Sequence, residues 1–354
     1  MINASGIGTY IKNLVPLVIE DFKQIKFFIM GKKTDLSPLG LLEKPNVEHI
    51  EFNAPIYTIK EQVLFPRLIP KETSLFWAPH YNFPVLFRGN LLVSIMDLGH
   101  LALRQINHEP SKRLYANFMF NQIKKRAIAT IYISKFSKNE FNKYVGIPKS
   151  KQVITLLGIN KDWFNISIED QIYEKPYILS VGNLKPHKNL GALIKAFGRL
   201  RTKIPHNLVI VGKKEGFITG DNTLVEKANK FMDRIIFTGE VSHRDLKQYF
   251  KQADIFAFPS IYEGFGFPPL ESMVAGTPVV ASNAASIPEV CGDAVLYFDP
   301  FNIHDIAEKI LNLITDVSLK NKLIKRGKNH VKKYTWDKTA FQTSNIIINL
   351  LERN

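Results

Sequence analysis

DIFAFPSIYEGFGFPPLESMVAGTPVVA, residues 254–281, is the stretch that decides the fold. It starts with one apolar run, Asp254–Phe258, and ends with another, Pro278–Ala281, and both are typical of buried strands. Between them a loop with two glycines opens a helix near Pro268, since proline is favoured in a first helical turn, where its missing N–H costs nothing. The order strand, loop, helix, strand indicates a parallel βαβ unit.

The same alternation of apolar runs and helical patterns extends along all 354 residues. Many runs are continuous in Val, Ile, Leu and Phe, which is typical of strands buried on both faces of a parallel sheet. The length suits two domains. We therefore predict an α/β fold with two doubly wound units. The expected strands are Lys26–Gly31, Val47–Phe52, Leu75–Ala78, Leu91–Ile95, Thr130–Ser134, Val153–Leu157, Tyr177–Val181, Asn207–Val211, Ile235–Thr238, Ile255–Phe258, Pro278–Ala281 and Val295–Phe298.

A charged stretch without a clear period, residues 162–176, separates the two series of strands and ends in proline. We predict an amino-terminal Rossmann-like domain over residues 1–165 and a carboxy-terminal domain over 174–335. The residues after Thr335 form a further helical pattern.

The chain starts with a glycine pattern, Ser5–Tyr10, which we interpret as a turn leading into a helix over Tyr10–Ile19. In a Rossmann unit such a turn follows a buried first strand. Met1–Ala4 is too short to form that strand, so the first domain is expected to lack it.

Composition excludes several classes of protein. Hydrophobic residues make up 45% and charged residues 22%, as in ordinary globular proteins. The single cysteine, Cys291, excludes an intramolecular disulfide framework and a cysteine-rich metal site, and it fits a reducing cytoplasm. No uncharged apolar run reaches the roughly 18 residues of a membrane-spanning helix. The first ten residues lack the basic start and apolar stretch of a secretory signal.

The chain is basic, with 47 Lys and Arg against 32 Asp and Glu and a net charge of +15. Residues 1–165 contain 22 basic and 12 acidic residues, so most of the surplus lies in the first half. A basic face can meet nucleic acid, an anionic membrane or a phosphorylated substrate, and a lysine-rich solvated surface explains it equally well. We predict no nucleic-acid partner, because the sequence shows no base-reading helix, zinc motif or aromatic stacking motif.

The loop in the deciding stretch has the chemistry of a ligand site. Gly264 and Gly266 let the backbone approach a ligand, and the helix start behind them presents N–H groups to an anion. Glu263 precedes the loop, and Glu271 is expected in the first helical turn. A carboxylate can accept hydrogen bonds from two neighbouring sugar hydroxyls. Taken alone, each glutamate is better explained by solvation or by an interaction with the helix dipole. The two glutamates together with the glycine loop favour a ligand that has a sugar at each end and phosphate in the middle.

A second cluster, Ser180–Leu190, reads SVGNLKPHKNL and lies between an expected strand and a helix over Leu190–Leu200. Lys188, at the helix start above a glycine turn, supplies a positive charge for a phosphate. A surface turn with solvated lysines explains the pattern equally well, and Asn189 is suited to cap the helix.

Together these motifs resemble glycosyltransferase family 4, which has the GT-B fold. Glu263 and Glu271 match its E-x₇-E motif, Gly182–Asn189 its G-N-L-x-P-x-K-N turn, and Ser5–Tyr10 its amino-terminal glycine loop. The resemblance implies two doubly wound Rossmann-like domains facing a central cleft, with a carboxy-terminal helix over 336–354 that crosses back to complete the first domain. It covers almost the whole chain, including Ala78–Pro84, Val93–Leu98 and Tyr132–Lys138.

The resemblance places a nucleotide-sugar donor mainly on the carboxy-terminal domain. It implies that Glu271 holds the ribose hydroxyls, Glu263 contacts the transferred sugar and Lys188 neutralises the diphosphate. It also implies retention of the anomeric configuration without a bound metal or any cofactor besides the donor substrate. The remaining donor-binding residues are expected to be Asn183, Gly264, Phe265, Gly266 and Phe267, with Val241 bordering the base.

The first domain is expected to line the cleft and receive the acceptor. The resemblance places Gly6 and Gly8 at the cleft. It also implies a His-Asp pair after the fourth strand, with Asp97 as a catalytic residue. Met96 stands where the family commonly has histidine, and methionine cannot donate a hydrogen bond to a sugar hydroxyl. His80 and His100 are therefore expected near Asp97 on the acceptor side, although a lone histidine is more often structural.

A second departure from the family is Asn183, which stands where many relatives have arginine. Lys185 or Lys188 would then carry the anion alone.

The expected function is that of a retaining hexosyltransferase acting on a glycan or lipid-linked acceptor in cell-surface polysaccharide or lipopolysaccharide biosynthesis. GDP-mannose is the first donor expected, because the motifs resemble those of mannosyltransferases and rhamnosyltransferases. We expect the protein in the cytoplasm, peripheral at the inner face of the cytoplasmic membrane, where the basic surplus favours anionic lipid. Lys124–Arg126 is the best local candidate for that contact, and a solvated helix face is its alternative.

Two other functions stay open. Met96 and the short start are compatible with a truncated or degenerate relative that binds a nucleotide sugar without catalysis. A sugar epimerase of the GT-B fold is the third reading, although an epimerase does not normally carry the E-x₇-E helix.

Overall fold

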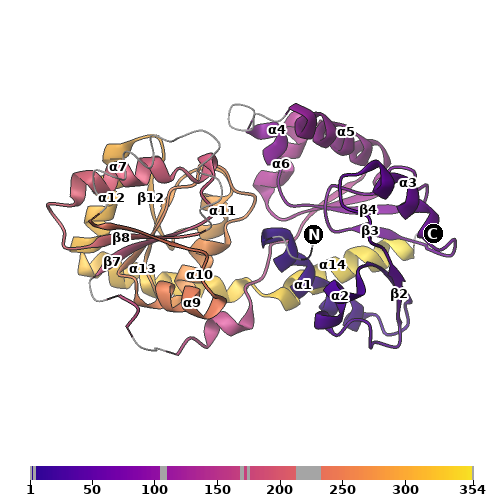
Figure 1. The fold of residues 1–354 in the computed structure, drawn as a ribbon, viewed down its shortest axis with the longest axis horizontal. Coiled ribbons are helices and arrows are strands. Elements are labelled where there is room, and N and C mark those ends of the chain that lie inside the picture. Colours follow the sequence, from indigo (N-terminus) through magenta and orange to yellow (C-terminus); the bar gives the residue numbers. More distant parts are fainter. Residues whose placement is uncertain are drawn as a thin grey trace. The chain divides into compact units, whose positions relative to one another are not determined.

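The computed structural model describes residues 2, 5–103, 110–167, 171–173, 176–212 and 233–352. The chain divides into two compact units, unit 1 with residues 1–158 and 334–354 and unit 2 with residues 159–333 (Figure 1). Every strand expected from the apolar runs is present, with ends within three residues of the expected ones.

Unit 1 is built on parallel strands. Its elements in chain order are α1 (Ser5–Asp21), β1 (Phe27–Gly31), α2 (Lys33–Leu36), η1 (Ser37–Leu39), β2 (Val47–Glu51), α3 (Ile59–Leu68), β3 (Phe76–Ala78), β4 (Leu91–Ile95), α4 (Gly99–Ala102), α5 (Pro110–Arg126), β5 (Ala129–Tyr132), α6 (Lys135–Tyr144), β6 (Lys151–Ile154) and α14 (Trp336–Leu351), where η denotes a 3-10 helix.

The strands of unit 1 fall into two separate parallel sheets. One sheet pairs β1 with β2, and the other has the order β3–β4–β5–β6. Strands β4 and β5 are buried along their whole length, whereas every residue of β1 is only half-buried. The two sheets are not joined by a hydrogen-bonded strand among the described residues.

Helix α1 begins at Ser5, so Gly6 and Gly8 lie inside its first turn. The prediction of a glycine turn before Tyr10 is therefore wrong. The physical reason is the apolar spacing, because Tyr10, Leu14 and Val18 recur every four residues and are fully buried. Burial of this face stabilises the helix along its length, including the turn that contains the glycines. The Tyr10 hydroxyl also hydrogen-bonds Ser94 of β4 at 2.9 Å.

Gly6 offers a direct test of its helical role. A Cβ added at this exposed position meets no described atom within 4 Å. We expect Gly6→Ala to raise the free energy of unfolding by up to about 0.5–1 kcal/mol, because alanine loses less backbone entropy on folding. Gly40→Ala has equally open space but a φ of +62°, so it is expected to destabilise the protein. Urea denaturation of the two variants checks the pair, and a loss of stability in Gly6→Ala contradicts the helical role.

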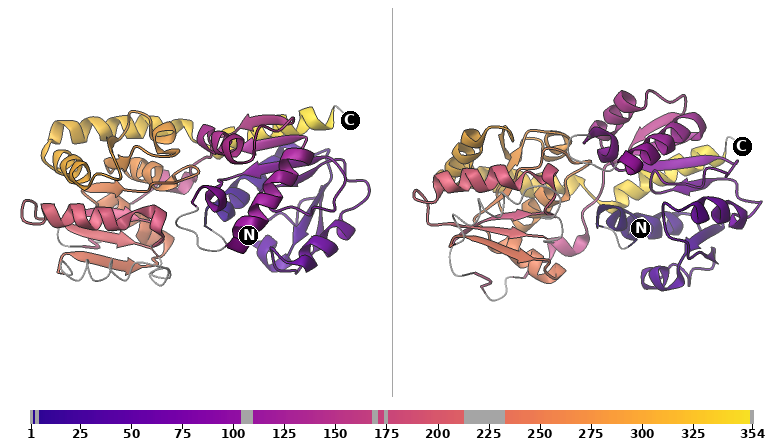
Figure 2. Two further views of the ribbon diagram at one scale, coloured as in Figure 1. Left: turned by 90° about the horizontal axis from the view of Figure 1, so that it is seen from above. Right: turned by 45° about the horizontal axis from the view of Figure 1, so that its top comes forward.

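Helix α14 packs beside α1 and therefore belongs to unit 1 (Figures 1 and 2). The Trp336 ring meets Tyr10 edge-on at 6.4 Å between centroids. Near the other end of the pair, the Ser344 hydroxyl donates to the Asp21 carboxylate at 2.7 Å.

Unit 2 contains one six-stranded parallel sheet. Its elements are η2 (Lys161–Phe164), β7 (Tyr177–Val181), η3 (Pro186–Lys188), α7 (Leu190–Leu200), β8 (Asn207–Val211), β9 (Ile235–Gly239), α9 (His243–Gln252), β10 (Ile255–Phe258), α10 (Phe267–Ala275), β11 (Val279–Ser282), α11 (Ile287–Cys291), β12 (Leu296–Phe298), α12 (Ile303–Thr315), α13 (Val317–His330) and η4 (Val331–Lys333).

The strand order β12–β11–β10–β7–β8–β9 shows that the chain starts in the middle of this sheet. It runs outward from β7 to β9, returns to β10 on the other side of β7, and runs outward again to β12. Helices cover both faces, α7 and α12 on one and α9, α10 and α13 on the other (Figures 1 and 2). The reversal between β7 and β10 is a topological switch point, where doubly wound proteins bind ligands at the carboxyl ends of the strands.

Residues 159–165 belong to unit 2, which corrects the predicted boundary at 165. The reason is a set of contacts with α9. Trp163 is buried and its ring meets Phe250 at 5.4 Å, while the Asp162 carboxylate accepts hydrogen bonds from His243 at 2.9 Å and from Lys247 at 2.8 Å. Burial of the tryptophan ring ties this segment to the second core.

The helices of the described residues are all too short or too polar to cross a lipid bilayer.

Candidate functional site

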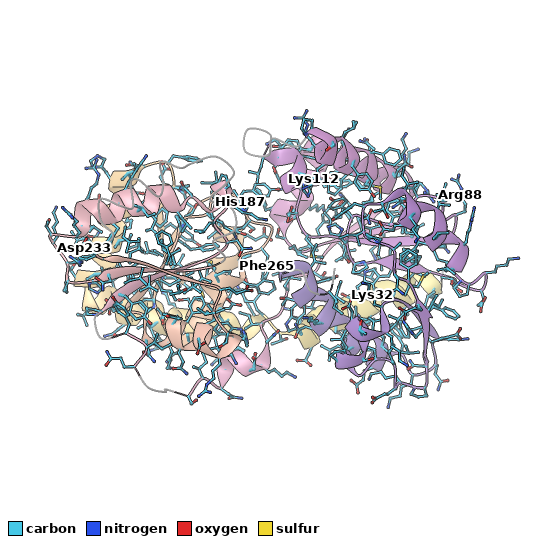
Figure 3. All side chains as sticks on the ribbon, viewed as in Figure 1. Lys32, Arg88, Lys112, His187, Asp233 and Phe265 are labelled. Carbon is cyan, nitrogen blue, oxygen red and sulfur yellow. The ribbon has the colours of Figure 1, made fainter. Side chains whose placement is uncertain are left out.

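The switch point of unit 2 brings together the two loops that the sequence singles out. One loop follows β7 and contains η3, and the other follows β10 and leads into α10. The N–H of Ile261 in the second loop donates to the carbonyl of His187 in the first at 2.9 Å. His187 and Phe265 mark the two loops at the same end of unit 2 (Figure 3). Strand order thus joins motifs that lie more than seventy residues apart in the chain.

Lys188 and Glu263 form an ion pair at this point. The Lys188 Nζ lies 2.6 Å from Glu263 Oε1, and the two side chains are only 18% and 14% exposed. The Lys188 ammonium also lies 5.8 Å from the centroid of the Phe258 ring. Partial burial strengthens the attraction compared with a surface pair. The arrangement is suited to an anionic ligand, because a phosphate that binds Lys188 replaces or shares the carboxylate.

Gly266 shapes the loop ahead of α10. It stands just before the helix with a φ of +106°, which a residue with a side chain rarely adopts, and it caps the helix without a side-chain hydrogen bond. Pro268 follows in the first turn, as expected. The positive end of the helix dipole therefore lies beside the Lys188–Glu263 pair.

Ser286 is a member of the site that the sequence did not reveal. Its hydroxyl is fully buried and lies 2.9 Å from the carbonyl oxygen of Glu263 and 2.8 Å from that of Phe265. Ser286 therefore fixes the backbone of the loop at both residues. It stands at the start of α11, fifteen residues after Glu271 and outside the motif. An isolated serine carries no recognisable pattern, so only its contacts show its role.

Replacing Gly266 tests the loop conformation. We expect Gly266→Ala to lower the free energy of unfolding by about 1–3 kcal/mol, because alanine is strained at this φ. Space is not the cause, since the nearest neighbour of an added Cβ is a Phe258 ring atom at 4.0 Å. Gly264→Ala is the comparison, because the φ of Gly264 is not positive. If wild type and Gly266→Ala unfold at the same temperature, the prediction of backbone strain at position 266 is wrong.

Glu271 lies in the second turn of α10, because the helix starts at Phe267; the expectation of a first-turn position is wrong. The side chain is half-buried, and in the described part of the chain its carboxyl group has no hydrogen-bond partner. Burial raises the pKa of Glu271 to about 8, and the nearby Asp162 carboxylate adds to the rise. A half-buried carboxyl group without a protein partner can accept hydrogen bonds from the hydroxyl groups of a ligand.

The remaining residues of this group lie around the same end of the sheet. Asn183 is half-buried in the loop after β7, and Val241 is half-buried between β9 and α9. Burial, with Lys188 adding to it, lowers the pKa of His187 to about 4, so its imidazole is neutral at neutral pH. Asn189 stands at the N-cap position of α7 with a φ of +54°, but its side chain makes no cap hydrogen bond, because its amide donates to the Pro300 carbonyl at 2.8 Å.

In unit 1 the acceptor-side residues gather at the carboxyl ends of β3 and β4. Burial lowers the pKa of His80 to about 3, and His100 contributes to the shift. Its Nδ1 accepts a hydrogen bond from the Asn82 N–H at 3.2 Å. The Tyr81 ring lies between the two histidines, 4.1 Å from His80 and 6.1 Å from His100. The histidines are thus close enough to interact, and His80 is neutral.

Asp97 is exposed, and its Oδ1 accepts a hydrogen bond from the Gly99 N–H at 2.8 Å, which fixes the start of α4. Met96 is buried beside it, and its carbonyl accepts from the Ser137 hydroxyl at 2.9 Å. The position that is commonly histidine in the family therefore serves packing in this chain, and Asp97 is the group that faces solvent.

The basic segment Lys124–Arg126 is less available than its sequence indicates. The Lys124 ammonium donates to the Val145 carbonyl at 2.7 Å, and the Arg126 guanidinium donates to the Val85 carbonyl. Lys125 is exposed. Two of the three charges are thus used inside unit 1, because they lie where α5 meets neighbouring loops.

Three or more His, Cys, Asp or Glu side chains do not come close enough to hold a metal ion anywhere in the described ranges.

Comparison with known proteins relates unit 2 to a family. Residues 163–330 match the family described as glycosyl transferases group 1. O-antigen chain mannosyltransferase B of Escherichia coli is 32% identical over 223 residues, which cover 60% of this chain and 58% of that protein. The chain thus spans less than two thirds of the length of this relative.

Solved structures show the same fold. Sucrose-phosphate synthase from Thermosynechococcus elongatus superposes with a TM-score of 0.78 at 20% identity, over 99% of this chain and 95% of that one. Alr3699/HepE of Anabaena, solved in complex with UDP and glucose, superposes with a TM-score of 0.75 at 17% identity, over 96% and 95%. The chain has the GT-B fold, with two doubly wound α/β units. Residues 163–330, which lie in unit 2, thus match the group 1 glycosyl transferases, and the chain as a whole shares its fold with these solved structures.

Proposed function

We propose that this chain transfers a hexose from a nucleoside diphosphate sugar, bound by unit 2, to a glycan or lipid-linked acceptor. The observation that carries the proposal is the Lys188–Glu263 pair at the switch point, beside the start of α10 and the unpartnered Glu271 carboxyl group. A cation, a helix dipole and two carboxyl groups match the phosphates and hydroxyls of such a donor.

Each group has a task in this proposal. Lys188 binds the diphosphate and stabilises it as it leaves, so that Glu263 is released to contact the transferred sugar. Glu271 accepts hydrogen bonds from the ribose hydroxyls. The backbone of residues 264–267 surrounds sugar and phosphate, while Asn183 lies near the phosphates and Val241 borders the base.

We further propose that transfer retains the anomeric configuration and needs no metal. The leaving phosphate takes the acceptor's proton on the same face of the sugar, while Lys188 and the α10 dipole offset its negative charge. Transfer should then continue in the presence of EDTA, and NMR of the product should show the anomeric configuration of the donor. Loss of transfer with EDTA, restored by a divalent ion, contradicts the metal-free mechanism.

Mannose is the proposed sugar, supported by the name of the Escherichia coli relative. GDP-mannose is therefore the first donor to test, and UDP-glucose the second, because the Anabaena neighbour was solved with UDP and glucose. Calorimetric titration with GDP, UDP and both nucleotide sugars, followed by incubation with a membrane extract and mass spectrometry, tests the proposal. Binding without transfer favours a non-catalytic relative. Isomerisation of a free nucleotide sugar without acceptor favours an epimerase.

We propose a cytoplasmic protein that works at an anionic membrane surface in cell-surface polysaccharide synthesis, supported by the basic surplus of residues 1–165. Arg113 and Lys125 are exposed on α5 and are the charges that we expect to make this contact. Co-sedimentation with vesicles of phosphatidylglycerol and phosphatidylcholine should increase with anionic content and fall with salt. Binding that ignores both variables rules out electrostatic docking.

A further inference from the structure

Unit 1 contains a cluster of polar and aromatic side chains that the nucleotide-sugar site does not use. Tyr57 precedes α3, Glu61 lies in its first turn, Asn82 follows β3 and Tyr115 belongs to α5. Asp97, which follows the neighbouring strand β4, lies at the same edge of the sheet.

A buried carboxylate organises this cluster. Glu61 is 7% exposed and accepts hydrogen bonds from the Asn82 amide at 2.9 and 3.1 Å and from the Tyr57 N–H at 2.7 Å. The Tyr115 hydroxyl donates to the other end of the Asn82 amide, its Oδ1. Burial raises the pKa of Glu61, while the Asn82 hydrogen bond opposes the rise. This chain of bonds connects three elements and holds Tyr57 in one place.

Tyr57 is held in a strained conformation at a partly exposed position. Its φ is +66°, in the left-handed region that bulky residues avoid. The side chain is nevertheless 44% exposed, so burial of the ring does not explain why the fold tolerates this strain. Strain that surrounding hydrogen bonds enforce on an exposed residue is a feature of ligand sites.

The surroundings of the Tyr57 ring define a surface for a ligand. The ring stacks on Tyr81 with 6.3 Å between centroids and 27° between planes, and it meets Tyr115 edge-on at 5.7 Å. His80 lies 6.3 Å away. The start of α4 belongs to the same surroundings, because the Tyr81 ring lies 6.1 Å from the His100 ring and Asp97 accepts a hydrogen bond from the Gly99 N–H at this helix start. A partly exposed aromatic ring and an exposed carboxylate therefore lie at the same edge of the sheet.

We propose that Tyr57 and Asp97 form the acceptor subsite of unit 1 and that this subsite takes the terminal pyranose of a neutral glycan. The inference rests on the proposed function and names its acceptor class. The C–H face of a pyranose packs on an aromatic ring, and its hydroxyls donate to a carboxylate. Asp97 Oδ1 is engaged with Gly99, which leaves Oδ2 for such a hydroxyl.

The charges around the ring argue against a phosphate at this position. Burial raises the pKa of Tyr57, the carboxyl groups of Glu61 and Asp97 add to the rise, and Lys112 at the start of α5 opposes them (Figure 3). Two carboxyl groups near the ring disfavour a phosphate dianion at this position. Hydroxyl groups, which donate hydrogen bonds to carboxylates, meet no such penalty.

The experiment compares ligands and variants on the full chain. Saturation-transfer NMR and calorimetry follow binding of neutral disaccharides of mannose, glucose and galactose, with mannose 6-phosphate as the charged comparison. We expect at least one neutral disaccharide to bind better than mannose 6-phosphate, and Tyr57→Ala to weaken that binding about tenfold or more. Phe341→Ala, which removes another exposed aromatic ring of unit 1 on α14, should leave it unchanged.

Tyr57→Gly adds a readout that a merely structural role does not produce. Glycine relieves the strain at φ +66°, so this variant should unfold at a higher temperature than Tyr57→Ala while losing the disaccharide equally. GDP and UDP binding should be the same in all variants. Unchanged disaccharide binding in Tyr57→Ala, no disaccharide binding by wild type, or a preference for mannose 6-phosphate overturns the inference. A chain that binds no nucleotide overturns the proposed function instead.

Discussion

Lys188→Ala is expected to reduce sugar transfer by about 100- to 1000-fold, the usual loss when a group that stabilises developing negative charge is removed. The variant also leaves Glu263, only 14% exposed, without its partner at 2.6 Å. An uncompensated carboxylate at this position repels the diphosphate that the lysine would attract. Initial rates with GDP-mannose or UDP-glucose, whichever donor is active, measure the effect.

Lys185→Ala is the matched control, because Lys185 belongs to the same turn but is exposed. It should retain nearly full activity, which separates the position of Lys188 from the general charge of the loop. Lys188→Arg should keep the charge and lose part of the rate, since guanidinium and ammonium differ in geometry. If Lys185→Ala is the inactive variant and Lys188→Ala is active, the anion site lies elsewhere in the turn.

Glu271→Ala is expected to weaken nucleotide binding about 100-fold, because two hydrogen bonds from ribose hydroxyls to one carboxyl group are lost together. Glu271→Gln should lose less, since its carbonyl still accepts from one hydroxyl. Calorimetry with the nucleotide diphosphate measures both, and Glu308→Ala, an exposed glutamate on α12, is the control. Unchanged affinity in Glu271→Ala removes this residue from the donor site.

The same residue should make stability depend on pH. The pKa of Glu271 is raised from 4.5 to about 8 in the folded protein. Between these values the folded state keeps a proton that the unfolded state has lost, so this group makes the protein less stable as pH rises, until about pH 8. Glu271→Gln does not titrate, so its Tm should exceed that of wild type by more at pH 8 than at pH 5. Parallel Tm curves for the two proteins would show that the carboxyl group titrates normally.

The strands were predictable because each carries its own signal. A continuous apolar run such as Ile255–Phe258 is buried on both faces wherever it sits in a parallel sheet, and the structure has a strand with those bounds. The prediction of a turn at Gly6 and Gly8 was wrong because a glycine turn and the first turn of a helix have similar local sequence patterns. The buried face of α1, with Tyr10 and Leu14, is what decides between them.

The contacts within the site could not be predicted, because they join residues that are far apart in the sequence. Glu271 is expected from its motif, but its desolvation involves η2, a segment about one hundred residues earlier that packs against α10. Ser286 and the Tyr57–Glu61 cluster have no motif at all. Their roles are visible only through hydrogen bonds between elements.

By itself, the sequence determined the α/β class, the strands of both units and the two loops that carry the family's motifs, because apolar periodicity and glycine or proline turns act over a few residues. Only the tertiary structure decided that Lys188 pairs with Glu263, that Glu271 is left without a partner and that Tyr57 is held in strain. Strand order places these residues, and ion pairing, desolvation and strain depend on the atoms that the fold brings next to them.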